Sequence, residues 1–306
     1  MPAVARIDPK EVFTPAEWAR LAPRSSWRGL VLVAGAWGLI VGAGAMFVLW
    51  PNPFTYVLAV MLIGARQLGL AILMHDAAHG ALHSNQKIND WAGDWLCAAP
   101  VGARLAAYRA YHLKHHRYTE QPEDPDLGLS APFPILRASL ARKIFRDLSG
   151  QTFFKQRIAP VFAKRAESRE GGNVTARAVN SFLIVNALLF AALALVGLWW
   201  AYPALWIVPM ATWFPLVTRL RNIAEHACVD TKEDPFSHAR TTLANALERL
   251  FIAPYWVHYH GEHHVFMHLP CYRLPLAHRL LKAKGYLPRM IVAKGYAAVL
   301  RQASAA

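Results

Sequence analysis

Two long stretches of the sequence contain no charged residue: Gly29 to Ala65 and Ala178 to Thr218. Each is about twice as long as the roughly 20 apolar residues that a helix needs to cross the hydrocarbon core of a bilayer. Prolines interrupt both near the middle, Pro51 and Pro53 in the first stretch and Pro203 in the second. Because proline ends or kinks a helix, each stretch is predicted to fold as a hairpin of two helices.

The pattern therefore predicts four transmembrane helices, from Leu30 to Trp50, Pro53 to Leu73, Ser181 to Ala201 and Ala204 to Leu220. Lysine and arginine are absent from both hairpin turns and abundant in the segments outside the hairpins. By the positive-inside rule, both termini and the segment between the hairpins are expected to be cytoplasmic. We expect one all-α integral membrane domain, 1–306, with hairpins at about 30–73 and 181–220. The cytoplasmic segments 74–177 and 221–306 should form a helical cap.

Composition supports a membrane protein, because 55% of the residues are hydrophobic and only 17% are charged. The formal net charge is +14, which on an apolar chain indicates contact with anionic lipid headgroups rather than with nucleic acid. The three cysteines, Cys97, Cys228 and Cys271, are far apart and form no CxxC pair. Neither a disulfide framework nor a thiolate zinc site is therefore expected.

The histidines occur in groups with helical spacing. His75 and His79 lie four residues apart at the end of the second predicted span. Two triplets repeat an i, i+3, i+4 spacing: the first is His112, His115 and His116, and the second is His260, His263 and His264. A single histidine, His226, follows the fourth predicted span. Such spacing puts each group on one face of a helix. All four groups are expected on the cytoplasmic side.

Nine imidazoles from four segments exceed the four ligands of a zinc site, so the sequence predicts two metal ions. Imidazole binds iron, copper, zinc and nickel. A ligand shell without thiolates that leaves open coordination positions for dioxygen favours iron. Zinc could replace iron in a structure. Asp76, Glu225 and Glu262 are placed to accept the second ring N–H of a ligand histidine. His83, one turn beyond His79, is a further candidate beside the metals.

Three motifs in this order resemble the histidine boxes of the membrane fatty acid desaturase and hydroxylase superfamily. The first is His-Asp-Ala-Ala-His at 75–79, and the second is His-Leu-Lys-His-His-Arg at 112–117, followed by Glu-Asp-Pro-Asp at 123–126. The third is Tyr-His-Gly-Glu-His-His at 259–264, followed by His-Leu-Pro at 268–270. The resemblance covers nearly the whole chain, including the two hairpins.

The resemblance implies a diiron enzyme that uses dioxygen to abstract hydrogen from an unactivated C–H bond of a lipid. The nine histidines of the four groups would be the ligands, and Asn222, four residues before His226, would approach one metal through a water molecule. Enzymes of this kind take electrons from a separate ferredoxin, rubredoxin or cytochrome b partner. The chain has no cysteine spacing for an iron–sulfur cluster, so we expect an external donor.

Desaturation of a fatty acyl chain is the first functional hypothesis. A hydroxylase or ketolase acting on a carotenoid or another apolar substrate is the second, because the same boxes serve both reactions. A membrane metal-binding protein without redox chemistry is the third; the absence of acidic residues and histidines inside the predicted hairpins argues against a transport path. The alanine- and arginine-rich sequence is typical of a bacterial inner membrane protein.

Overall fold

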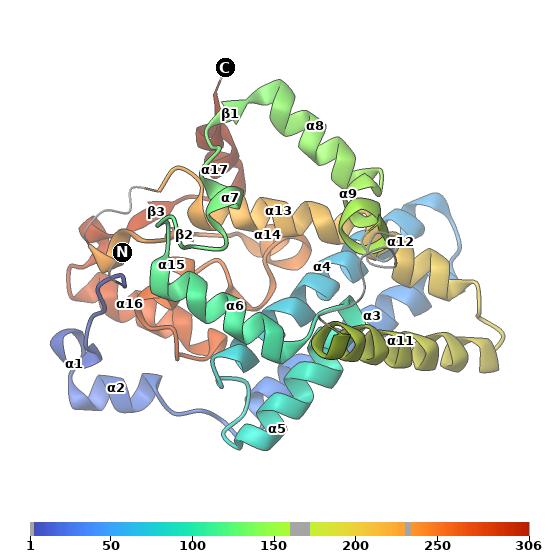
Figure 1. The fold of residues 1–306 in the computed structure, drawn as a ribbon, viewed down its shortest axis with the longest axis horizontal. Coiled ribbons are helices and arrows are strands. Elements are labelled where there is room, and N and C mark those ends of the chain that lie inside the picture. Colours follow the sequence, from blue (N-terminus) through green and yellow to red (C-terminus); the bar gives the residue numbers. More distant parts are fainter. Residues whose placement is uncertain (1–2, 160–171, 230–233, 306) are drawn as a thin grey trace.

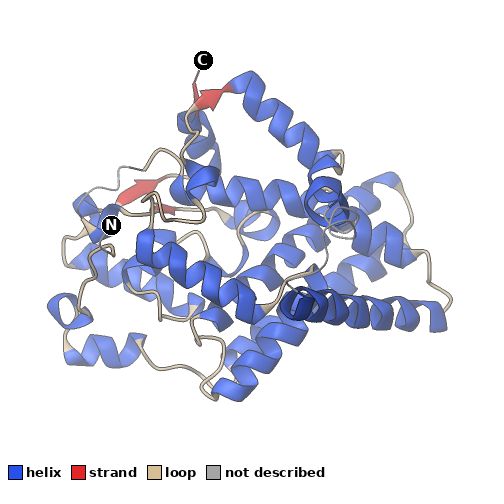
Figure 2. Ribbon diagram, viewed as in Figure 1, coloured by secondary structure: helices blue, strands red, loops and turns tan. Residues whose placement is uncertain are grey.

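The computed structural model describes residues 3–159, 172–229 and 234–305, and Figure 2 shows that these are mainly helical. The first hairpin consists of α3 (Arg28–Leu49) and α4 (Pro53–Ala78), which pack against each other. Asn52 starts α4 by a capping box with Thr55, directly before the proline that opens the helix. α4 continues beyond the predicted end at Leu73, so it carries His75 out of the apolar segment on a continuous helix.

The second hairpin is less regular than predicted. α11 (Gly172–Leu195) is followed by a π-helix, η4 (Tyr202–Ile207), and then by α12 (Val208–Ala211) and α13 (Trp213–His226). The expected single helix from Ala204 to Leu220 is thus broken, and Thr212 has non-helical backbone angles of φ −122° and ψ −73°. Pro209 and Pro215 flank the break, and each removes a backbone N–H that a continuous helix would use.

Among the described helices, α3 and α4 are the two that are long and apolar enough to cross a membrane. The part of α11 from Ser181 to Leu195 is a shorter apolar helix. Part of the predicted cytoplasmic segment 74–177, at 160–171, lies outside the described residues. Two hairpins are therefore present as structural units, with a broken rather than a continuous fourth helix.

α4 is the central helix of the molecule (Figure 1) and packs against α3, α6, α12 and α13. Its residues from Ile63 to Leu70 are buried, including the polar Gln67, whose amide donates to the carbonyl of Trp206 at 2.9 Å. Gly64 allows close approach, because a Cβ there would lie 2.7 Å from the Cβ of Trp213. These contacts hold the two hairpins together and fix the end of α4 relative to α13.

The cap is built from short helices around α6 (Leu105–Tyr118), α15 (His260–Val265) and α16 (Leu274–Ala283). The remaining helical elements are α1 (Pro9–Val12), α2 (Pro15–Leu21), α5 (Gln86–Trp91), η1 (Ala92–Ala98), η2 (Ala99–Val101), α7 (Leu127–Ser130), α8 (Arg137–Leu148), α9 (Gln151–Phe153), η3 (Phe154–Ile158), η5 (Pro235–Ser237), α14 (Ala246–Phe251), η6 (Pro254–Trp256), η7 (Cys271–Arg273), η8 (Leu287–Arg289) and α17 (Tyr296–Ala303). In Figure 1, α1, α2 and α16 lie at the end of the molecule opposite the turn between α3 and α4.

The cap also contains two small parallel sheets, so the prediction of helices alone is corrected. β1 (Ile135–Leu136) pairs with β4 (Ser304–Ala305), and β2 (Arg240–Thr242) pairs with β3 (Ile291–Ala293). Strands of two or three residues are too short to give an alternating pattern in the sequence. β2 nevertheless matters for the site, since it packs against both α13 and α15.

Candidate metal centre

The structure brings all nine histidines of the predicted groups together, although they come from four separate segments. His75 lies near the end of α4 and His79 directly follows that helix, the first triplet is on α6, His226 ends α13, and the second triplet is on α15. They form two clusters, the first of His75, His79, His112, His116 and His263, and the second of His115, His226, His260 and His264. Within each cluster, one ring nitrogen of every member lies within 4.8 Å of those of all the others.

The Nε2 atoms approach one another at distances typical of ligands that share a cation. Nε2 of His116 lies 3.0 Å from Nε2 of both His112 and His263. In the second cluster, Nε2 of His260 lies 3.0 Å from that of His226 and 3.1 Å from that of His264. Two nitrogens at right angles, each about 2.1 Å from one metal ion, are about 3 Å apart. Hydrogen bonds between the rings cannot account for all of these short distances, because the N–H of one ring points at a single neighbouring nitrogen.

Burial favours the neutral form of six of the rings that the cap contributes. It lowers the pKa of the cap histidines of both clusters well below the ordinary value of 6.5, and the neighbouring imidazoles lower it further; this holds for His112, His116, His226, His260, His263 and His264. Neutral imidazole is the form that binds metal. Among the described residues, neither ring nitrogen of His75 or of His79 has a hydrogen-bond partner. Buried polar atoms are almost always paired, and a bound cation would pair one nitrogen of each of these two rings.

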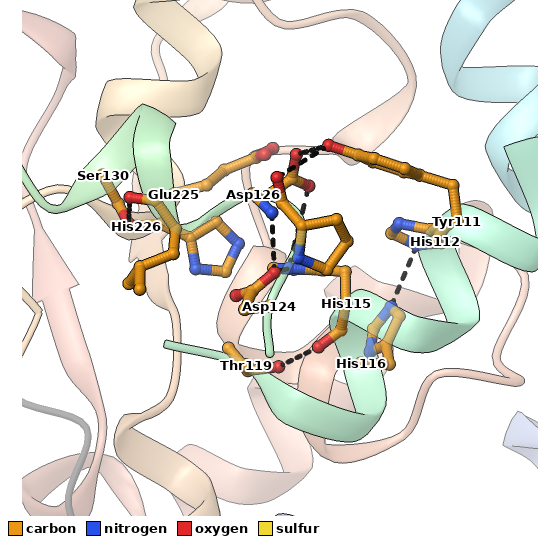
Figure 3. Close-up of polar contacts among 12 residues, drawn as sticks. Tyr111, His112, His115, His116, Thr119, Asp124, Asp126, Ser130, Glu225 and His226 are labelled. Atoms are coloured by element: carbon orange, nitrogen blue, oxygen red, sulfur yellow. Dashed lines mark hydrogen bonds and ion pairs between the residues drawn. The ribbon is translucent and has the colours of Figure 1, made fainter. Parts of the chain in front are cut away.

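A carboxylate orients His115 in the second cluster. Nδ1 of His115 lies 2.9 Å from Oδ1 of Asp124 (Figure 3), and the backbone N–H groups of Glu120 and Asp126 both donate to the same carboxylate at 2.8 Å. With the proton on Nδ1, His115 donates to Asp124 and turns its Nε2 lone pair toward the cluster. Asp124 belongs to the Glu-Asp-Pro-Asp motif, to which the sequence analysis assigns no role at the site.

Two further carboxylates face ring nitrogens of the second cluster. Oε1 of Glu225 lies 3.4 Å from Nδ1 of His260 and accepts a hydrogen bond from Nε of Arg221 at 2.6 Å. Oε1 of Glu120 lies 3.6 Å from Nδ1 of His226. Burial raises the pKa of Glu225 and of Glu120 to about 7. Glu225 thus lies beside His260 without forming a hydrogen bond to it among the described residues, and Glu120 has no helical spacing that would have pointed to it.

Asp76 and Glu262 differ from the prediction that they accept from clustered histidines. Asp76 accepts a hydrogen bond at 2.9 Å from the backbone N–H of Cys271, and its other oxygen lies 3.8 Å from Nδ1 of His75. Glu262 is fully buried and accepts instead from Thr241 and from Nδ1 of His278, the latter at 2.6 Å. Glu262 therefore ties α15 to β2 and α16. Helical periodicity predicts which histidines lie together. It does not predict which side chain a neighbouring carboxylate contacts.

His83 lies outside both clusters. Its Nδ1 accepts a hydrogen bond at 2.9 Å from the backbone N–H of Asn85, and its own backbone N–H donates to the side chain of Asn89. α4 ends at Ala78, so the helical face that would have carried His83 toward His79 does not continue. His83 therefore has a structural part in the turn that starts α5.

Arg240 is a buried residue that the sequence analysis does not identify. Its side chain is 1% exposed and donates to the backbone carbonyls of Ala227 at 2.7 Å, Cys228 at 3.1 Å and Ala224 at 3.2 Å. These carbonyls lie at the C-terminal end of α13, where a helix carries partial negative charge. The guanidinium thereby fixes the end of the helix that carries His226.

A cavity of about 210 Å³ opens beside the clusters. His112, His115, His226 and His260 contribute to its wall, and Asn222 lies beside them. Other parts of the wall are apolar, formed by Leu68, Ala71, Met74, Leu129 and Phe214. A second cavity of about 140 Å³ shares Leu129, Phe214, Thr218 and Asn222 with the first, so the two adjoin.

Comparison with known proteins agrees with this centre. The family model for fatty acid desaturases matches residues 51–293. The chain is 28% identical to a dihydrorhizobitoxine desaturase of Bradyrhizobium elkanii, over 81% of this chain and 74% of that protein. It is 25% identical to a β-carotene ketolase of Paracoccus sp. (strain PC1), over 75% and 84%, and 22% identical to an sn-1 acyl-lipid omega-3 desaturase (ferredoxin) of Synechocystis sp., over 80% and 72%. The chain therefore belongs to the fatty acid desaturase family of membrane oxidoreductases.

Proposed function

We propose that this protein is a dioxygen-dependent diiron desaturase that introduces a double bond into a fatty acyl chain. The observation that carries the proposal is the meeting of two histidine clusters beside a cavity with an apolar wall. One iron would be held by His75, His79, His112, His116 and His263, and the other by His115, His226, His260 and His264. Asn222 would hold a water molecule at the second iron.

The iron pair would supply the activation of dioxygen that removes two hydrogens from a saturated C–C unit. The protein's own residues would hold the two irons and orient the histidine ligands. Asp124 keeps the Nδ1 proton of His115 away from the metal side, and the Glu225 carboxylate faces Nδ1 of His260. Burial of both clusters excludes bulk water from the reacting carbon. Zinc could fill the same sites, because imidazole binds zinc at least as tightly as ferrous iron.

The substrate is proposed to be an acyl lipid that enters from the bilayer. Leu68, Met74 and Phe214 form an apolar wall beside the histidines, and Phe214 and Leu129 extend it into the adjoining cavity. The Synechocystis relative is named as an acyl-lipid desaturase. Two electrons are needed for each dioxygen, and we propose a separate carrier protein of the ferredoxin, rubredoxin or cytochrome b class as their source; the name of the same relative specifies ferredoxin.

We further propose that both hairpins cross a bacterial inner membrane from the cytoplasm, with both termini on the cytoplasmic side. Apolar side chains near the two hairpin ends, such as Phe54 at 75% exposed and Leu195 at 88%, support a lipid environment there. A single reactive cysteine placed at Asn52 should be labelled only from the periplasmic side, and one placed at Ser149 only from the cytoplasmic side. Labelling of both from one side would contradict this topology.

Mass spectrometry of lipids and pigments tests the reaction. Cells that express the wild type with a compatible reductase and carrier should contain an acyl species lighter by two hydrogens, and His263→Ala should lack it. His83→Asn is the matched control, because His83 lies outside both clusters and an asparagine oxygen can replace its acceptor nitrogen. Full product in the His263→Ala cells would contradict the diiron proposal.

Hydroxylation or ketolation is the second candidate, and the similarity to a β-carotene ketolase favours it. The same measurement separates the reactions, because hydroxylation makes a product heavier by one oxygen atom, whereas ketolation adds one oxygen atom and removes two hydrogens. A non-redox metal-binding role would instead predict bound metal without any mass change in lipids or pigments.

A further inference from the structure

One exposed histidine touches the buried centre from the outer face of the cap. His268 is exposed, and its ring lies edge-on to that of His79 with 6.3 Å between centroids. His79 belongs to the first cluster and is itself buried. The pair therefore forms a direct aromatic link from the protein surface to a candidate metal ligand.

Basic side chains surround this link. Partial burial of the His268 ring lowers its pKa, and the guanidinium groups of Arg24 and Arg6, which are both exposed, lower it further. Arg24 lies close to the chain just after His79, since a Cβ on Gly80 would be 3.4 Å from its Nη1. Among the described residues, neither Arg6 nor Arg24 forms an ion pair with a carboxylate. No carboxylate among the described residues therefore neutralises the positive charge of these two arginines by direct contact.

The N-terminal segment places the positive charge of Arg6 near histidines of both clusters. The backbone N–H of Val4 donates to the carbonyl of Arg117 at 3.0 Å, which ties the segment to the end of α6. Arg6 lines a small cavity of about 30 Å³ whose wall also includes His116 and His264. In Figure 1 the N-terminus lies beside α15, at the end of the molecule away from the turn between α3 and α4. The basic face therefore lies on the side that the proposed topology exposes to the cytoplasm.

We propose that the face formed by Arg6 and Arg24 around His268 docks an acidic, soluble one-electron carrier protein, and that the contact between His268 and His79 is where its electrons enter. The inference rests on the proposed function. In each encounter the carrier is oxidised by one electron and the metal centre is reduced by one, so two encounters serve each dioxygen. Positive charge around the link would steer and orient an acidic partner.

A second basic surface of the cap, on α8, is better suited to lipid. Arg142 and Arg146 lie on the same short helix as Phe145, which is 64% exposed, and Leu148. A helix with exposed apolar and basic side chains together is typical of the membrane interface. In Figure 1, α8 runs along the edge of the molecule, far from α15 and the N-terminus.

Binding to the metal-free protein tests the docking face without relying on turnover. The full chain in nanodiscs would be titrated with an acidic plant-type ferredoxin at about 50 mM and 500 mM salt. The double variant Arg6→Glu/Arg24→Glu should weaken binding at low salt about tenfold or more, whereas Arg142→Glu/Arg146→Glu should leave it within about twofold. A monodisperse elution profile would show that each variant is folded.

Reduction of the iron-loaded protein adds a second readout. His268→Ala should slow reduction by ferredoxin in stopped-flow measurements while leaving reduction by photoreduced riboflavin, a small donor that needs no docking face, unchanged. Wild-type affinity of the Arg6→Glu/Arg24→Glu protein, loss of binding in the α8 variant instead, or no ferredoxin binding by the wild type would each overturn the docking proposal. Failure of the proposed function is distinct, because it would appear as tight, salt-sensitive binding without any lipid product.

Discussion

Nδ1 of His115 and Oδ1 of Asp124 lie 2.9 Å apart, and both side chains are buried. Asp124 is itself held by two backbone N–H groups, so its position does not depend on a flexible partner. The contact fixes which nitrogen of His115 faces the second cluster. It also assigns a structural role to the acidic motif that begins six residues after the second histidine motif ends.

Replacing Asp124 with asparagine should weaken metal binding at the second cluster. The amide cannot act as a charged acceptor for the Nδ1 proton, and loss of such a partner typically costs about 10- to 100-fold in metal affinity. Competition with a chromophoric chelator would measure the change. Asp126→Asn is the control, because the Asp126 carboxylate lies farther from His115, at 3.7 Å. Equal affinities in the two variants would contradict the role assigned to Asp124.

Arg240→Met should impair the second cluster through α13 rather than by removing a ligand. It leaves buried carbonyls of Ala224 and Ala227 without their donor, which costs at least about 2 kcal/mol. We expect about half of the wild-type iron content, with the remaining iron in a mononuclear signal by electron paramagnetic resonance. Arg240→Lys should restore part of the diiron signal. A stability loss without any change in iron content would mean that Arg240 supports the fold only.

Metal retention should fall as the pH is lowered. The unfolded chain takes up protons near the ordinary histidine pKa of 6.5, whereas burial lowers the pKa of folded rings such as His116 and His263 well below it. Below about pH 6.5 the unfolded state therefore binds more protons, and the metal-free protein loses stability as the pH falls. Protons also compete with metal for the same nitrogens. Thermal unfolding and iron release at pH 8 and pH 6 would check this; greater stability of the metal-free protein at pH 6 would contradict it.

Close packing between the hairpins predicts a clear effect of adding one methyl group. In Gly64→Ala the new Cβ would lie 2.7 Å from that of Trp213 and 3.1 Å from the backbone nitrogen of Phe214, so we expect a loss of about 1–3 kcal/mol. Gly42→Ala is the matched control, since no atom lies within 4 Å of a Cβ added there. Thermal midpoints in detergent would compare them, and a Gly64→Ala midpoint equal to that of the control would argue against this packing.

Local helical spacing in the sequence was sufficient to group the nine histidines, because each group occupies one face or one end of a helix that does form. The sequence did not reveal Glu120, Asp124 or Arg240, because these residues lie in turns and in a three-residue strand where no periodicity marks a face. The broken fourth helix follows from Pro209 and Pro215, but their effect depends on tertiary packing that a continuous apolar stretch conceals. For Glu262 the spacing predicts a clustered histidine as partner, whereas the carboxylate contacts Thr241 on β2 and His278 on α16.

The most direct test of the central claim is the metal content and X-ray absorption spectrum of the purified protein after iron loading. The two histidine clusters predict about two irons per chain, each with nitrogen and oxygen neighbours and no sulfur. His263→Ala should lose iron, and His83→Asn should not. A single iron per chain, or a sulfur neighbour from one of the cysteines, would contradict the assignment of the nine histidines to a diiron centre.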